Sequence, residues 1–159
     1  MSRKTLWIAG AVVVAILYAV GYLVWLANQP SVLSRSQTKD PLSGYPTKVE
    51  LNPLRDRAPE RSAEQMIRAM HDGQCREKLA DWLKDYRQQY ASFICNSEQQ
   101  HPLVSWTLFD REEDPPLVML HYRARRKDST APTAYTEDLW VTTQNRDGAW
   151  AVTKYGAFY

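Results

Sequence analysis

Residues 5–27 decide the architecture of the chain and read TLWIAGAVVVAILYAVGYLVWLA. None of these side chains is charged. At a rise of 1.5 Å per residue, a helix of this length extends about 34 Å, which is enough to cross a hydrocarbon core of about 30 Å. The stretch is apolar on every face, whereas a helix at the surface of a soluble domain is apolar along one stripe. The sequence therefore predicts a transmembrane helix over residues 5–27.

The sequence favours an uncleaved anchor over a secretory signal peptide. The apolar core of a signal peptide holds about 7–15 residues and ends at a cleavage site with small side chains. Here the apolar stretch is longer, and bulky Trp25 lies where a small residue is needed. Arg3 and Lys4 precede the stretch, and Arg35 is the first charge after it. The positive-inside rule then places residues 1–4 in the cytoplasm and the chain from Asn28 onward outside, in the periplasm of a bacterial inner membrane.

Small side chains follow one face of the predicted anchor at Ala11, Ala15 and Ala19. This spacing permits close approach of another transmembrane helix. Two interpretations stay open, because alanine is also common in helices that face only lipid. We expect these alanines to mark an anchor-packing face if the chain assembles through its membrane helix.

The residues after the anchor are balanced in charge and begin with a proline-rich segment. The whole chain has 20 Lys and Arg against 18 Asp and Glu. No basic patch of the kind that binds nucleic acid stands out, so we expect no nucleic-acid partner. Residues 28–61 contain five prolines and are predicted to be an extended linker. The linker is either a disordered spacer or a strap along a partner, with contacts at Tyr45, Val49, Leu51 and Leu54.

Residues 62–159 are predicted to fold as one exported domain. Ser62 and Gln65 have the spacing of a helix-capping box. The following helix has an apolar face at Ala63, Met66, Ile67 and Met70, and Gly73 is a typical helix stop.

Alternating apolar residues then predict strands at 103–110, 117–126, 134–143 and 149–155. Residues 111–116, 127–132 and 144–148 are the predicted turns. Short turns between successive strands indicate an antiparallel meander. The predicted fold class is α+β: one N-terminal transmembrane helix, then helices packed on a curved antiparallel sheet of about four strands.

The order of these features resembles a known superfamily. A helix, the phrase His71-Asp-Gly-Gln-Cys75, a short helix, a second cysteine and a sheet ending in Trp150-Ala-Val-Thr-Lys154 look like the nuclear-transport-factor-2-like (cystatin-like) superfamily. The resemblance covers residues 62–159. Members behind one N-terminal anchor include periplasmic core components of type IV secretion systems and Mce-associated proteins. The resemblance implies an assembly role, with other membrane or envelope proteins as partners.

The two cysteines, Cys75 and Cys95, both lie in the portion predicted to be exported, where disulfides form. The apolar spacing from Leu79 to Ile94 favours a single helix, which would hold the two Cα atoms about 30 Å apart. A disulfide requires a separation below about 7 Å. We predict the bond, and therefore a break in the helix within residues 84–90.

The sequence offers few candidates for chemistry. His71, His101 and His121 lack the spacing of metal ligands, and no nucleophile motif or phosphate-binding loop is present. We expect no enzymatic activity, no catalytic or metal-binding residue, no cofactor and no small-molecule substrate. A basic run contains Arg123, Arg125, Arg126 and Lys127, and it either contacts an acidic partner or forms a solvated sheet edge. Terminal Phe158 and Tyr159 either pack on the sheet or contact a partner.

Two hypotheses about function follow. The first is a single-pass structural or assembly subunit of a bacterial envelope complex. The second is a stand-alone periplasmic binder, such as an immunity protein against a toxin or a domain that holds a small ligand.

Overall fold

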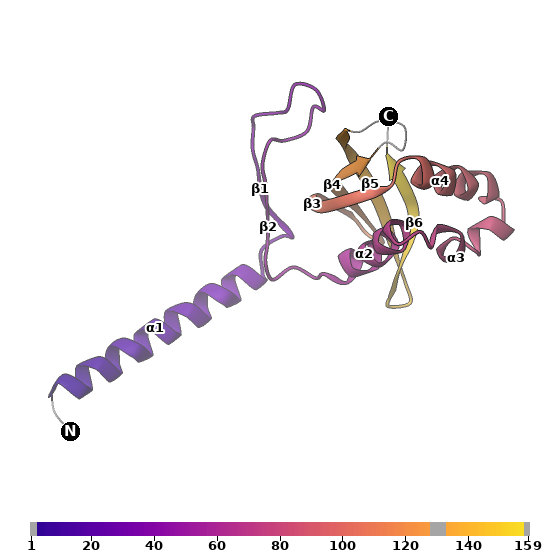
Figure 1. Ribbon diagram of the computed structural model, residues 1–159. Coiled ribbons are helices and arrows are strands. Elements are labelled where there is room, and N and C mark those ends of the chain that lie inside the picture. The colour runs from indigo at the N-terminus through magenta and orange to yellow at the C-terminus, as the bar shows by residue number, and fades with distance from the viewer. Residues whose placement is uncertain (1–2, 128–132, 158–159) are drawn as a thin grey trace. The chain divides into compact units, whose positions relative to one another are not determined.

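A computed structural model of the chain describes residues 3–127 and 133–157. The chain divides into two compact units, Met1–Arg55 and Asp56–Tyr159, which are described separately below (Figure 1). The first unit consists of a long helix and a β-hairpin. The second contains three α-helices, a 3-10 turn and a four-stranded sheet.

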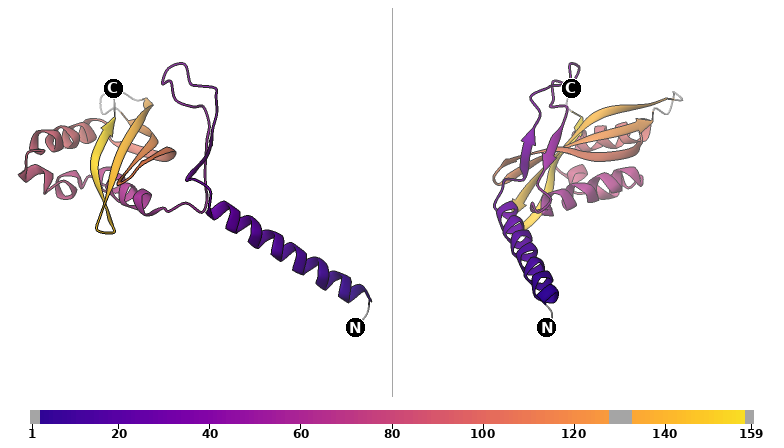
Figure 2. Two further views of the ribbon diagram at one scale, coloured as in Figure 1. Left: turned by 180° about the vertical axis from the view of Figure 1, so that it is seen from behind. Right: turned by 90° about the vertical axis from the view of Figure 1, so that its left-hand side faces the viewer.

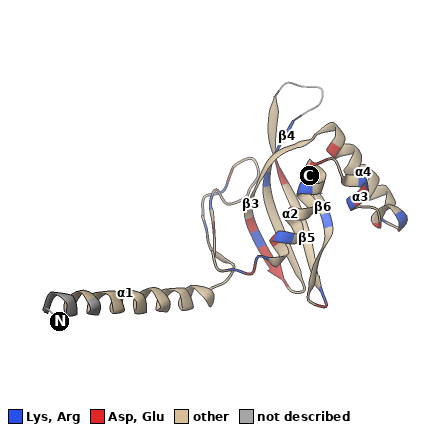
Figure 3. Ribbon diagram, turned by 60° about the horizontal axis from the view of Figure 1, so that its bottom comes forward, with Lys and Arg blue, Asp and Glu red and all other residues tan. Residues whose placement is uncertain are grey.

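The first unit begins with helix α1 (Arg3–Ala27). Its segment Gly10–Ala27 has a mean hydropathy of 2.2 and is almost wholly exposed, so it is long and apolar enough to span a membrane and is not the core helix of this domain. After Arg3 and Lys4 the helix carries no charge, and Figure 3 shows no charged residue along the part of it drawn in tan. Ala11, Ala15 and Ala19 all lie exposed on it.

The predicted linker, residues 28–61, contains a small β-hairpin. A disordered spacer was one of the two interpretations of this segment. Strands β1 (Val32–Arg35) and β2 (Val49–Leu51) pair antiparallel. Between them, the carboxylate of Asp40 accepts hydrogen bonds from the backbone N–H groups of Leu42 and Ser43, at 2.8 and 3.1 Å. Gly44 follows with φ of 72°, a conformation that favours glycine. Short β-prone segments around an aspartate-glycine turn explain the hairpin.

A buried asparagine joins the end of this hairpin to helix α1. The side-chain amide of Asn52 donates to the backbone carbonyls of Leu26 and Gln29, at 2.8 and 3.2 Å. The last carbonyls of a helix have no partner within the helix, so these bonds satisfy part of the C-terminus of α1.

The second unit starts with helix α2 (Ala58–His71), four residues before the predicted start at Ser62. Pro59 lies in its first turn, where a missing N–H group costs nothing. The carboxylate of Asp56 accepts the N–H of Ala58 at 2.8 Å. Ser62 has another role, because its hydroxyl donates to the carbonyl of Trp150 at 3.0 Å. The predicted apolar face is confirmed, since all four of its residues are buried.

The structure confirms both the disulfide and the helix break. Cys75 and Cys95 are bonded, with Cα atoms 5.5 Å apart. The chain between them forms three short pieces: α3 (Cys75–Lys78), the 3-10 turn η1 (Trp82–Lys84) and α4 (Gln88–Gln100). The helix therefore ends earlier than predicted, after Lys78, and resumes at Gln88.

The return of the chain is stabilised at Asp85. This residue is extended, and its carboxylate accepts the backbone N–H of Arg87 at 2.7 Å. The hydrogen bond from the Arg87 side chain holds the pKa of Asp85 below its usual value.

Four strands form an antiparallel meander in the order β3-β4-β5-β6 (Figure 2). They are longer than predicted: β3 (Leu103–Asp114), β4 (Leu117–Lys127), β5 (Ala134–Arg146) and β6 (Ala149–Ala157). Residues 111–114, predicted as a turn, complete β3. The last hairpin is also tighter than predicted, because Asp147 and Gly148 alone make the turn, with φ of 53° and 86°. The turn predicted after Lys127 lies mostly outside the described residues.

The core lies between one face of the sheet and the helices. Leu120 and Tyr122 on β4 face Val141 and Leu139 on β5, and all four are buried. Trp82 is buried in this core, while Trp106 and Trp150 pack at its margin. The predicted fold class is thus confirmed.

We predict that replacing both cysteines, Cys75→Ala with Cys95→Ala, lowers the free energy of unfolding by about 3 kcal/mol, because the bond closes a loop of 20 residues in the unfolded chain. Denaturant titration of the full-length protein in detergent measures this change. Alkylation of the denatured, unreduced wild type provides the control and should modify no thiol. Two reactive thiols per chain would contradict the bond.

Candidate functional site

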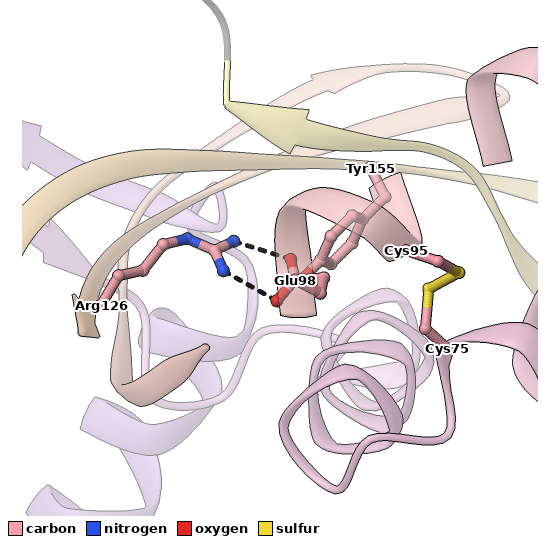
Figure 4. Close-up of a disulfide and its surroundings, with 5 residues drawn as sticks. All are labelled: Cys75, Cys95, Glu98, Arg126 and Tyr155. Atoms are coloured by element: carbon pink, nitrogen blue, oxygen red, sulfur yellow. Dashed lines mark hydrogen bonds and ion pairs between the residues drawn. A yellow bond between two sulfur atoms is a disulfide. The ribbon is translucent and has the colours of Figure 1, made fainter. Parts of the chain in front are cut away.

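The candidate site surrounds helix α4, which is held from two sides. Cys95 bonds it to the start of α3, and Glu98 follows one helical turn later. Figure 4 shows Glu98 between Arg126 of β4 and Tyr155 of β6, with the disulfide beyond Tyr155 in this view. Glu98 therefore connects α4 to two strands that are not neighbours in the sheet.

A buried ion pair forms the centre of the site. The guanidinium of Arg126 donates to both carboxylate oxygens of Glu98, at 2.7 and 2.8 Å. It also donates to the carbonyl of His101 at 2.7 Å and to the carboxylate of Glu137. Arg126 is 4% exposed and Glu98 is 7% exposed. Charges this deep are tolerated only when they are paired and hydrogen-bonded.

The phenol of Tyr155 completes the cluster. It is 1% exposed and donates to Glu98 at 3.0 Å. Burial, followed by the negative charge of Glu98, raises the pKa of Tyr155 well above its ordinary value. Burial alone would lower the pKa of Arg126, but the hydrogen bonds and charges of Glu98 and Glu137 outweigh burial and raise it. The tyrosine therefore stays neutral and the arginine stays charged at physiological pH.

A cavity of about 560 Å³ adjoins the cluster. Glu98, Arg126 and Tyr155 form its polar wall, and the rest of the lining includes Tyr90, Phe93, Ile94, His101 and Gly156. Its size suits a small organic molecule. Its charged groups already bind one another, so a ligand would be held mainly by apolar contact.

A second buried ion pair lies near the C-terminal end of β3. The guanidinium of Arg111 bonds the carboxylate of Glu60 at 3.1 Å and that of Glu113 at 2.6 Å. It also donates to the carbonyl of Asp56. The pair holds the first turn of α2 against the sheet. The sequence pattern did not reveal this ion pair, because it predicts a turn at residues 111–116.

The basic run on β4 is divided between the two faces of the sheet. Arg125 is exposed, and Arg123 lies over the ring of Phe109, 3.7 Å from its centre. Arg126 points inward and cannot serve as the surface contact that was predicted. Its position continues the inward alternation of Tyr122 and Ala124, a signal already present in the sequence.

The remaining predicted contact residues are scattered. In the first unit, Leu54 is 46% exposed, while Tyr45 and Leu51 are partly buried. Phe158 and Tyr159 lie outside the described residues.

The three histidines occupy separate places. The ring of His121 is buried on the sheet face opposite the helices, stacked on Trp140 and bonded to Asp138 at 2.7 Å. His71 bonds the adjacent Asp72 at 2.8 Å, and His101 packs edge-on against Tyr135. Within residues 3–127 and 133–157, no group of three potential metal ligands comes together.

Comparison with known proteins yields similarity of structure only. No protein-family model matches the sequence, and no curated protein matches it. The chain is similar to the solution structure of RPA3114, a SEC-C motif containing protein from Rhodopseudomonas palustris. The identity is 11% and the TM-score 0.48, over 67% of this chain and 84% of that one. It is also similar to a designed NTF2-like protein, at 18% identity and a TM-score of 0.44, over 61% of this chain and 98% of that one. These similarities concern the fold alone, and the membrane-anchored periplasmic subtype stays a prediction.

We predict that Glu98→Gln lowers the free energy of unfolding by about 3 kcal/mol, because it leaves the buried Arg126 short of one countercharge. Chemical denaturation measures the change. Glu112→Gln is the matched control, because Glu112 is exposed on β3, and it should change stability by less than about 0.5 kcal/mol. Equal effects of the two substitutions would contradict a central role for the ion pair.

We also predict that the protein loses stability above about pH 10 through Tyr155. The pKa of Tyr155 is raised in the folded state, so the phenol ionises at a lower pH in the unfolded chain. Each further rise in pH therefore stabilises the unfolded chain relative to the folded one. Tyr155→Phe should be less stable at neutral pH, because it lacks the bond to Glu98, but its stability should fall less steeply between about pH 10 and 11. Unfolding titrations at several pH values compare the slopes. Parallel slopes would show that Tyr155 titrates normally.

Proposed function

We propose that this chain is a single-pass, membrane-anchored structural or assembly subunit of a bacterial envelope complex, which acts through protein–protein contacts of its exported domain. The observation that carries the proposal is helix α1. Its segment Gly10–Ala27 is uncharged, almost wholly exposed, and long and apolar enough to span a membrane. Such a helix fixes the domain that follows it to a membrane surface.

The disulfide supports the proposed compartment. Bonds of this kind persist in oxidising environments such as the bacterial periplasm. The Cys75–Cys95 bond lies in the unit after the anchor. The charge pattern of Arg3 and Lys4 favours the same orientation, with the N-terminus in the cytoplasm.

The candidate site is also consistent with a structural role. Arg126, Glu98 and Tyr155 bond one another, and these bonds join α4 to the sheet. Groups arranged in this way stabilise a rigid domain.

The cavity beside α4 favours the alternative function. A space of about 560 Å³ with a largely apolar lining is suited to a small ligand. In that case the chain would be a stand-alone binder at the membrane surface.

Co-purification separates the two proposals. We predict that the tagged full-length chain, extracted in mild detergent, brings down other envelope membrane proteins in fixed stoichiometry. If the anchor contributes through its alanine face, the triple variant Ala11→Leu, Ala15→Leu and Ala19→Leu should lose partners, because larger side chains block close helix approach. The control replaces Val13, Val20 and Val24 with leucine, because these residues lie on the opposite face of the helix and the alanines stay in place. Purification of the wild type without membrane partners, or with one soluble ligand, would contradict the assembly role.

A further inference from the structure

The two edge strands of the sheet differ in how far other parts of the second unit cover their backbone. At β6, the hydroxyl of Tyr90 donates to the carbonyl of Tyr155 and accepts its N–H at 3.3 Å. The hydroxyl of Ser62 donates to the carbonyl of Trp150 on the same strand. Side chains from α4 and α2 therefore occupy backbone groups of this edge and hinder another strand from pairing there.

The other edge strand, β3, has no such cover along its first half. Within the described residues of the second unit, no other element hydrogen-bonds across the outer edge of residues 105–108. Val104, Ser105 and Thr107 are exposed. Residues 103–109 read LVSWTLF, with no charge, proline or glycine. This is the composition of a strand that pairs readily, without the lysine or proline that usually protects an exposed edge.

Irregularities at both ends limit the segment that can pair. The register with β4 shifts between Leu103 and Ser105, and again between Leu108 and Asp110. Such bulges bend an edge away from a new partner. The regular segment between them therefore defines where an added strand can lie.

We propose that the β3 edge pairs antiparallel with β3 of a second copy of this chain, with Trp106 facing Trp106 of the other copy. Addition of a strand to an open edge is an established mode of recognition, and a two-fold axis makes the same patch serve both copies. With this axis perpendicular to the sheet, Ser105 faces Thr107 of the second copy. The two sheets then become one continuous sheet with the helices of both copies on the same side.

The distribution of charge confines the register to the uncharged half of β3. The second half of β3 reads DREED, from Asp110 to Asp114. A register centred on Trp106 places the uncharged residues 103–109 of both copies opposite one another and leaves the charged residues outside them. A register centred on Glu112 would place that carboxylate opposite itself and Asp110 opposite Asp114, and facing like charges destabilise a strand pair. The same acidic segment disfavours a foreign acidic strand.

Cysteine cross-linking in membranes tests the proposal on the full-length chain. Ser105→Cys and Thr107→Cys chains carrying different tags are co-expressed, and oxidised samples are run on non-reducing gels. Directly opposite residues have Cβ atoms about 4.5–5.5 Å apart, whereas the same residue in two copies lies on a diagonal of about 7–8 Å, too far for a disulfide. A cross-linked dimer carrying both tags is therefore expected from the mixture and not from either variant alone. A dimer of either variant alone, a cross-link only to a different protein, or no cross-link by folded protein would overturn the proposal.

A charge placed on each edge provides the second measurement. Val104→Lys adds a lysine beside the proposed contact, and Ala151→Lys adds one at an exposed position of β6. In the two-cysteine mixture, Val104→Lys should reduce the cross-linked fraction several-fold, and Ala151→Lys should leave it unchanged. Circular dichroism confirms that both variants are folded. Equal yields from the two variants would also overturn the proposal, and because the cross-link reports β3 alone, this result would leave the proposed membrane role untouched.

Discussion

The buried ion pair between Glu98 and Arg126 attaches helix α4 to the sheet, and the rest of the second unit depends on this attachment. Helix α4 is short and follows a broken segment, so its own backbone bonds give it little stability. The disulfide fixes it to α3, and Glu98 fixes it to β4 and β6. The two constraints lie one turn apart on the same helix. Together they determine where α4 lies over the sheet and therefore the shape of the cavity beside it.

Burying charge has a physical cost, which the domain offsets by giving each buried arginine several partners. Arg126 bonds two carboxylates and a backbone carbonyl, and Arg111 does the same at the other end of the sheet. The bidentate bond from Arg126 to Glu98 is geometrically specific, so it fixes a position more narrowly than apolar packing would. The domain is thus rigid where helices meet strands, which suits a part that presents surfaces to partners.

The sheet is closed on one edge and open on the other, and the difference bears on assembly. Tyr90 and Ser62 occupy backbone groups of β6, while no described element of the second unit covers the outer edge of the uncharged half of β3. An anchor of the proposed kind would also confine copies of the chain to one membrane and raise their effective concentration. At this higher effective concentration, the short segment between the bulges would be sufficient to pair two copies, even if the same contact were weak between copies free in solution.

The sequence by itself determined the features that depend on local pattern. The uncharged residues 5–27, the apolar face of α2 and the alternation along β4 each follow from helix or strand periodicity, and the structure contains all three. The disulfide was also predictable, because both cysteines lie in the portion predicted to be exported and a bond between them requires the helix to break. The inward position of Arg126 was implicit in the alternation of β4. Only the tertiary structure could supply its partner Glu98, which comes from a helix far away in the chain. The inward position of Arg111 depends on the irregularity at Phe109, since one extra residue reverses which side chains face the core. Contacts of this kind join segments distant in sequence, and local periodicity carries no information about them.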